Sequence, residues 1–188
     1  MSIYLILAIV AFCIFLVYNI VTVKFFGMPT SLSDTYYLIE AKKKHFGYFF
    51  TAMMWSMAFC LAPGWLGISD AMPGWEHNFT FLAFLAAVYI IFVGSAPAFR
   101  GIELENKVHM WSAKLCAVFS IAWCAVVCWR IMYIIPIAIG LAWLIGWLLR
   151  NHTNEGRKWI KCSDYIWELA AFIATFGTII VQGIINMV

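Results

Sequence analysis

Long apolar stretches dominate this sequence and restrict what it can fold into. Of its 188 residues, 65% are hydrophobic and 11% are charged. A helix needs roughly 20 apolar residues to cross a bilayer, at about 1.5 Å per residue. Six stretches reach or approach that length: Ile3–Val23, Gly47–Ile68, Asn78–Ala98, Val108–Trp129, Ile131–Leu149 and Asp164–Met187. A soluble domain of this size has too little interior to bury them all. The sequence therefore predicts an all-α membrane protein, a bundle of six transmembrane helices forming one domain over residues 1–188.

The fourth and fifth stretches form an almost continuous apolar run from Val108 to Leu149. At helical rise this run is roughly 63 Å long, about twice the thickness of the hydrocarbon core, so it must fold back. Arg130 stands in this run with aromatic residues on either side. Arginine and aromatic residues favour the membrane–water interface. We therefore expect the turn at Trp129–Tyr133.

Lysine and arginine are distributed unequally between the predicted loops. Eleven of the 12 lie in or near the first, third and fifth loops, and Arg130 is the exception. Cytoplasmic loops are enriched in these residues. The sequence therefore predicts cytoplasmic odd-numbered loops and non-cytoplasmic termini, as in a bacterial inner-membrane protein. No basic region precedes Ile3–Val23 and no small-residue cleavage site follows it. This pattern favours a permanent span over a signal peptide.

Four polar side chains fall near the ends of predicted spans on one side of the membrane. Ser33 and Asp34 follow the first span, His109 is near the start of the fourth, and Glu168 is near the start of the sixth. A carboxylate inside a span costs roughly 2.5–3.5 kcal/mol, so it usually has a partner or a function. A histidine beside a carboxylate is also suited to acid–base chemistry. We therefore treat these four residues as candidate catalytic residues.

Basic residues surround the same predicted face. They are Lys42, Lys43, Lys44, Arg100, Lys107, Arg157 and Lys158. Lysine and arginine pair with phosphate groups. The sequence therefore predicts a binding site for a lipid or amphiphile headgroup at one leaflet, with membrane lipids as partners. It leaves open whether the site also transfers or hydrolyses an acyl or phosphoryl group.

Simpler structural roles are also open for the polar residues. In the first loop, Ser31 or Ser33 could cap a short interfacial helix over Ser33–Lys44. His109 could bind a loop carbonyl, and Glu168 could pair with a lysine of the fifth loop.

Two other functions compete with the headgroup site. One is a pore formed by a homo-oligomer, in which Glu168 lines a cation path. The other is an accessory structural subunit of a larger membrane complex. The sequence shows no spacing typical of a metal site, and no phosphate-loop or dinucleotide pattern, so it predicts no metal and no cofactor. Because the basic residues flank spans and form no single patch, a nucleic-acid partner is not expected.

Four short motifs follow one another in register with the six predicted spans. They are Pro29–Thr35 (PTSLSDT) after the first span, Ala96–Arg100 (APAFR) at the end of the third, His109–Ala113 (HMWSA) at the start of the fourth, and Trp167–Ala170 (WELA) at the start of the last. In this order the chain resembles the six-span family that includes the damage-regulated autophagy modulators, the yeast Sfk proteins and a GPI-anchor lipid-remodelling factor. The resemblance implies a membrane protein that handles or senses lipids, with the Ser-Asp loop and the histidine on one face.

Overall fold

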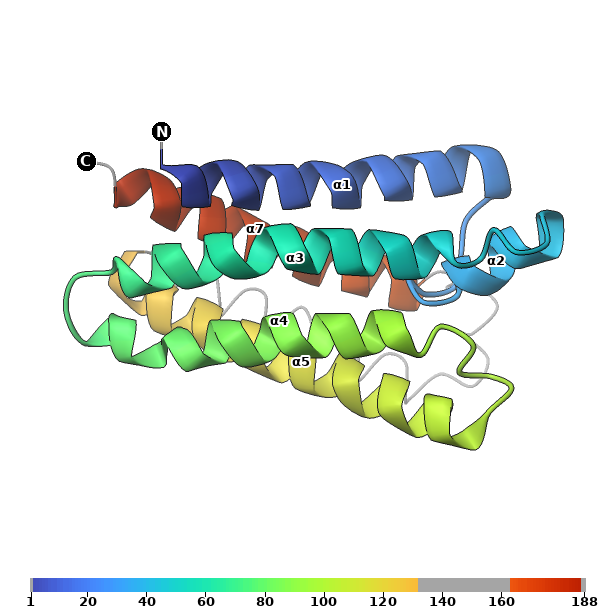
Figure 1. Ribbon diagram of the computed structural model, residues 1–188. Coiled ribbons are helices and arrows are strands. Elements are labelled where there is room, and N and C mark those ends of the chain that lie inside the picture. Colours follow the sequence, from blue (N-terminus) through green and yellow to red (C-terminus); the bar gives the residue numbers. More distant parts are fainter. Residues whose placement is uncertain (1, 132–162, 187–188) are drawn as a thin grey trace.

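Five long helices run roughly along one axis. The computed structural model describes residues 2–131 and 163–186. The long helices are α1 (Ile3–Phe26), α3 (Phe49–Asp70), α4 (Thr80–Ser95), α5 (Glu103–Ile131) and α7 (Ser163–Ile185) (Figure 1). The short helix α2 (Thr35–Lys42) follows α1, and a 3-10 turn, η1 (Trp75–Phe79), precedes α4. The four longest helices, and α4 together with η1, are long and apolar enough to cross a membrane.

The described chain thus confirms the all-helical prediction and five of the expected apolar helices. The predicted span Ile131–Leu149 lies outside the described residues, except for Ile131 itself. Helix α5 begins at Glu103, before the apolar stretch that starts at Val108. Glu103 and Glu105 in its first turn suit the positive end of the helix dipole, so the helix extends into polar sequence. It is still helical through Ile131, beyond the start of the predicted turn at Trp129.

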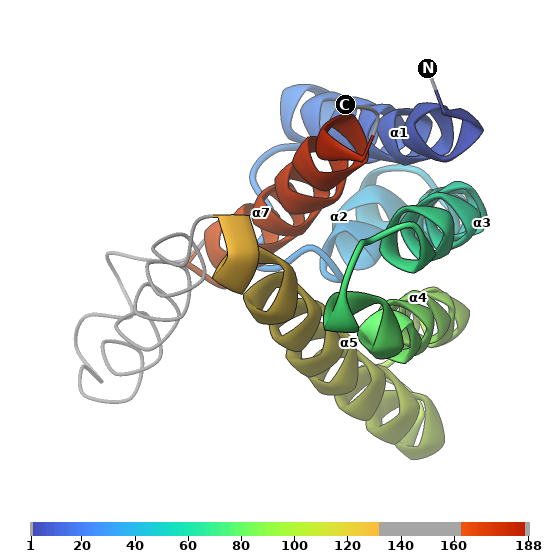
Figure 2. The same ribbon diagram turned by 90° about the vertical axis from the view of Figure 1, so that its left-hand side faces the viewer.

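The helices form two layers. Viewed along the bundle, α1, α3 and α4 stand in one row, and α5 and α7 lie on one side of that row (Figure 2). Neighbours along the chain pack together in the row, and α7 contacts both α1 and α5. Two helices distant in sequence, α1 and α7, therefore become adjacent, with the N-terminus and the end of α7 at the same end of the bundle (Figure 1).

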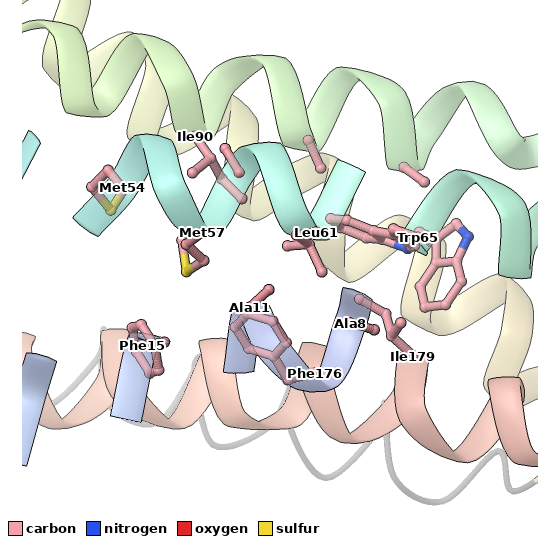
Figure 3. Close-up of a cluster of buried hydrophobic side chains, with 14 of the residues drawn as sticks. Ala8, Ala11, Phe15, Met54, Met57, Leu61, Trp65, Ile90, Phe176 and Ile179 are labelled. Atoms are coloured by element: carbon pink, nitrogen blue, oxygen red, sulfur yellow. The ribbon is translucent and has the colours of Figure 1, made fainter. Parts of the chain in front are cut away.

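The core lies where α1, α3, α4 and α7 meet (Figure 3). Its labelled side chains, each at most 2% exposed, are Ala8, Ala11, Phe15, Met54, Met57, Leu61, Trp65, Ile90, Phe176 and Ile179. Lipid tails are as apolar as these side chains, so close packing and polar contacts hold such helices together in a membrane. Small residues make that packing close: a Cβ placed on Gly64 of α3 would lie 2.7 Å from the backbone oxygen of Tyr4.

The outer surface of the bundle is apolar and several interior side chains are polar. Val17, Ile20 and Phe59 are more than 60% exposed, whereas Asn19 and Gln182 are about 5% exposed or less. This distribution is the reverse of that in a water-soluble protein and fits a surface in contact with lipid.

Candidate functional site

The predicted polar residues meet at one end of the bundle, where the chain between α1 and α3, the α4–α5 connection and the start of α7 lie together (Figure 1). Gly27 ends α1 with φ of 102°, a left-handed conformation that suits glycine, and the chain then turns across this end. We call this end of the bundle, where α1 and α4 end and α3, α5 and α7 begin, the loop end.

The segment between α1 and α2 is hydrogen-bonded to the first turns of α7. The backbone N–H of Tyr165 donates to the carbonyl oxygen of Thr30 at 3.0 Å. In the other direction, the backbone N–H of Leu32 donates to Oε2 of Glu168 at 2.5 Å. The first bond satisfies one of the free N–H groups at a helix start. Glu168 therefore holds the first loop in place through a backbone contact. The fifth-loop lysines with which it was predicted to pair lie outside the described residues.

Ser33 and His109 form a direct pair across 76 residues of sequence. Oγ of Ser33 lies 2.7 Å from Nε2 of His109. The other ring nitrogen, Nδ1, lies 3.0 Å from the carbonyl oxygen of Ala96. The imidazole is 2% exposed and stacks on the ring of Phe99, with centroids 4.4 Å apart. His109 therefore binds a loop carbonyl, which is one of the simpler structural roles that the sequence left open. It also binds the hydroxyl of Ser33.

Asp34 pairs with Arg100 on the neighbouring connection. Nη2 of Arg100 lies 2.5 Å from Oδ1 of Asp34, while Thr30 donates its hydroxyl to Oδ2. The guanidinium group also lies over the ring of Tyr37, 4.8 Å from its centroid, and the backbone N–H of Arg100 donates to the Tyr37 hydroxyl at 2.7 Å. The arginine is therefore fixed at several points, yet its side chain is 56% exposed.

The short helix after this loop is shorter than the predicted Ser33–Lys44. Helix α2 covers Thr35–Lys42, and Asp34 occupies its N-cap position without a side-chain cap bond. Ser31 accepts the backbone N–H of Asp34 at 3.1 Å. Neither Ser31 nor Ser33 therefore occupies the N-cap position that the sequence predicted for one of them. The Ser33 hydroxyl binds His109 instead.

Most of the predicted headgroup cations that the structure describes have contacts within the chain. Lys42 donates to the carbonyl oxygen of Phe25 at 3.3 Å, at the end of α1. Lys43 lies over the ring of Phe46, 3.7 Å from its centroid, and Lys107 pairs with Glu103 at 2.6 Å. Lys44 is exposed. Arg157 and Lys158 lie outside the described residues. Arg100 binds Asp34, the residue that follows Ser33.

Beyond α2 a second carboxylate organises the chain. The backbone N–H groups of His45 and Gly47 donate to the two oxygens of Glu40 at 2.9 and 3.0 Å. These bonds favour the ionised form, so they lower the pKa of Glu40 below its usual value. His45 has a φ of 67°, a left-handed conformation that a non-glycine residue adopts at some cost. Glu40 therefore stabilises the turn that leads into α3.

The residues that support the site were not predicted as site residues. Tyr37, Phe99 and the Ala96 carbonyl position Arg100 and His109. Ala96 and Phe99 lie in the motif Ala96–Arg100, whereas no charge or motif marks Tyr37. In the part of the chain that the structure describes, no three histidine, cysteine or acidic residues lie close enough to hold a metal ion. Comparisons with protein-family models, curated proteins and solved structures found no match to this chain.

Proposed function

We propose that this chain is a membrane protein that binds the phosphate-bearing headgroup of a lipid or amphiphile at the loop end, with Arg100 as the main anion-binding residue. The observation that carries the proposal is the combination of fixed contacts and solvent exposure of the Arg100 side chain. It is held by Asp34 and Tyr37, yet more than half of it is exposed at the end of an apolar bundle.

The Asp34–Arg100 pair adds little to stability, because an exposed ion pair is worth about 0–1 kcal/mol. Its effect is to orient the guanidinium group. Arginine has five N–H donors in a planar fork, and the described contact with Asp34 uses Nη2. The remaining donors can bind a phosphate in the two-pronged geometry that arginine favours. Because Asp34 follows Ser33 directly, a headgroup bound to Arg100 would also lie beside the Ser33–His109 pair.

The proposal includes six spans with the loop end in the cytoplasm. Helices α5 and α7 both begin at the loop end and run toward the opposite end (Figure 1). A chain that crosses twice in the same direction must return between the two crossings, which supports a sixth span in the predicted stretch Ile131–Leu149. Lys42 at the end of α2, Arg100 in the α4–α5 connection and Lys107 near the start of α5 lie at or near the loop end. Positive charge of this kind favours the cytoplasmic side of a bacterial inner membrane. The lipid-related function implied by the family resemblance is part of the same proposal.

The rival proposal of a pore draws less support. A ring of Glu168 carboxylates would have to face a shared axis of the oligomer. In the described chain, Oε2 of Glu168 instead accepts the Leu32 N–H within one protomer.

The experiment is native mass spectrometry of protein released from gentle detergent, which detects lipids that remain bound. The wild type is compared with Arg100→Gln and with Lys107→Gln, a control that removes one positive charge from the same region. We expect a phosphate-bearing lipid on the wild type and the control, and its loss from Arg100→Gln. Equal retention by both variants, or no selective lipid on the wild type, would contradict the proposal.

A further inference from the structure

The hydrogen bonds of His109 define which of its nitrogens carries the proton. A backbone carbonyl can only accept, so the bond to the Ala96 oxygen requires a proton on Nδ1. In the neutral ring Nε2 then has a free lone pair, and the hydroxyl of Ser33 donates to it at 2.7 Å. The serine proton is therefore already directed at a base, and a third group fixes the orientation of that base.

A nucleophile, a base within hydrogen-bond reach and a group that orients the base are the three parts of an activated serine. We propose that Ser33 and His109 form a nucleophile–base dyad that removes an acyl group from an ester of a membrane lipid. This inference rests on the proposed function, because Arg100 is the group that would hold the lipid headgroup beside Ser33. The Ala96 carbonyl takes the place of the carboxylate that orients the histidine in a catalytic triad.

The two candidate carboxylates have other roles in this arrangement. Asp34 binds Arg100 and Thr30 with its two oxygens, and Glu168 binds the Leu32 N–H. Both are therefore positioning residues: Asp34 orients the headgroup-binding arginine, and Glu168 fixes the loop that carries the nucleophile. The stacking of Phe99 on the imidazole and its burial hold the base in one orientation.

The location suits this chemistry. Ser33 is half-buried in the loop between α1 and α2, whereas His109 lies within α5, in its second turn. Both residues thus belong to elements that lie at the loop end of the apolar bundle (Figure 1). The ester groups of a lipid lie between its headgroup and its acyl chains. A lipid whose phosphate binds Arg100 would place those esters at about the depth of the dyad.

In the first step Oγ of Ser33 attacks the ester carbonyl carbon while Nε2 of His109 takes the hydroxyl proton. The tetrahedral intermediate then breaks its bond to the lipid alcohol, and that oxygen leaves with the proton from Nε2. Ser33 now carries the acyl group as an ester. Water attacks this ester in the second step, giving a proton to Nε2, and a free fatty acid leaves as Oγ recovers the proton.

Two reagents test the dyad on the purified full-length protein. A fluorophosphonate forms a stable bond with an activated serine, and p-nitrophenyl octanoate supplies an ester that acylates it. After each reaction, the adduct is located by mass spectrometry of the peptides. We expect both adducts on Ser33 of the wild type, and at least a tenfold slower reaction in His109→Gln. Ser31→Ala is the matched control, since it loses a loop hydrogen bond without touching the dyad, and it should react like the wild type.

Several results would overturn the dyad. An unlabelled wild type, an adduct on a serine other than Ser33, or equal rates in His109→Gln would each refute it. Labelling by fluorophosphonate without acylation by the octanoate would refute the acyl chemistry. Thermal unfolding of every variant is measured in parallel to show that the variant is folded. Locating the adduct on the wild type does not depend on any variant. Lipid retention by native mass spectrometry is independent of these reagents, so retained lipid on an unreactive protein would refute the dyad and leave the proposed function standing.

Discussion

The close approach of α1 and α3 gives a prediction with a built-in control. An added Cβ on Gly64 would lie 2.7 Å from the backbone oxygen of Tyr4 and 3.0 Å from the backbone nitrogen of Ala8. The first distance is about 0.7 Å shorter than the 3.4 Å at which ordinary contact begins. Both neighbours are backbone atoms of α1, so no side chain can rotate away and the two helices must separate.

Alanine substitutions at three glycines separate the cost of the close contact from the helix-forming gain of alanine. Inserting a group into a well-packed core costs about 1–3 kcal/mol, while alanine gains up to about 1 kcal/mol over glycine as a helix former. Gly177 has no atom within 4 Å of its added Cβ, so Gly177→Ala measures the helix-forming gain alone. We expect Gly64→Ala to be less stable than Gly177→Ala by about 1–3 kcal/mol. Gly67→Ala should fall between them, because its neighbour is the ring of Tyr4, which is 43% exposed and can turn outward.

The assay is reversible unfolding in mixed detergent micelles, followed by tryptophan fluorescence, with the three alanine variants beside the wild type. Equal stability of Gly64→Ala and Gly177→Ala would refute the claim that α1 and α3 meet backbone to backbone at this position. A Gly67→Ala variant that is less stable than Gly64→Ala would show that the ring, and not the α1 backbone, limits the approach.

Two further predictions concern single contacts. Ser69→Ala removes the acceptor for the Trp123 indole N–H, a 2.9 Å bond between fully buried residues, and should cost about 1–3 kcal/mol in the same unfolding assay; a loss below about 0.5 kcal/mol would mean that the indole finds another acceptor. Because the folded pKa of Glu40 is lowered by the N–H groups of His45 and Gly47, its contribution to stability is complete above the usual carboxyl pKa and is lost as the pH falls through the folded value. The difference in Tm between wild type and Glu40→Gln should therefore be larger at pH 7 than at pH 3.5, and a constant difference would contradict this role.

The helices could be predicted from sequence because apolar length alone specifies a membrane-spanning helix. The limits of α5 could not, because Glu103 and Glu105 extend it beyond its apolar stretch and hydropathy does not detect a polar first turn. The position of each polar residue at one end also followed from counting spans. Which side chain meets which did not follow from this count.

Those pairings depend on the geometry of two connections. Ser33 meets His109 because the turn after α4 places the Ala96 carbonyl against the other side of the imidazole ring. Arg100 was one of seven similar cations in the sequence, and what distinguishes it in the structure is its contact with Asp34, 66 residues away. Contacts at such separations are set by helix packing, for which one sequence carries no local signal.

The central claim is that the exposed Arg100 guanidinium binds a lipid phosphate. The most direct test is a titration of detergent-solubilised, delipidated protein with a short-chain phosphatidic acid, measured by native mass spectrometry for the wild type, Arg100→Gln and Lys107→Gln. Charge-assisted hydrogen bonds are worth about 1.5–3 kcal/mol, or roughly 10- to 150-fold in affinity. We expect Arg100→Gln to weaken binding by at least about tenfold and Lys107→Gln to leave it nearly unchanged. Equal weakening in the two variants would show a general attraction to positive charge and would contradict a headgroup site at Arg100.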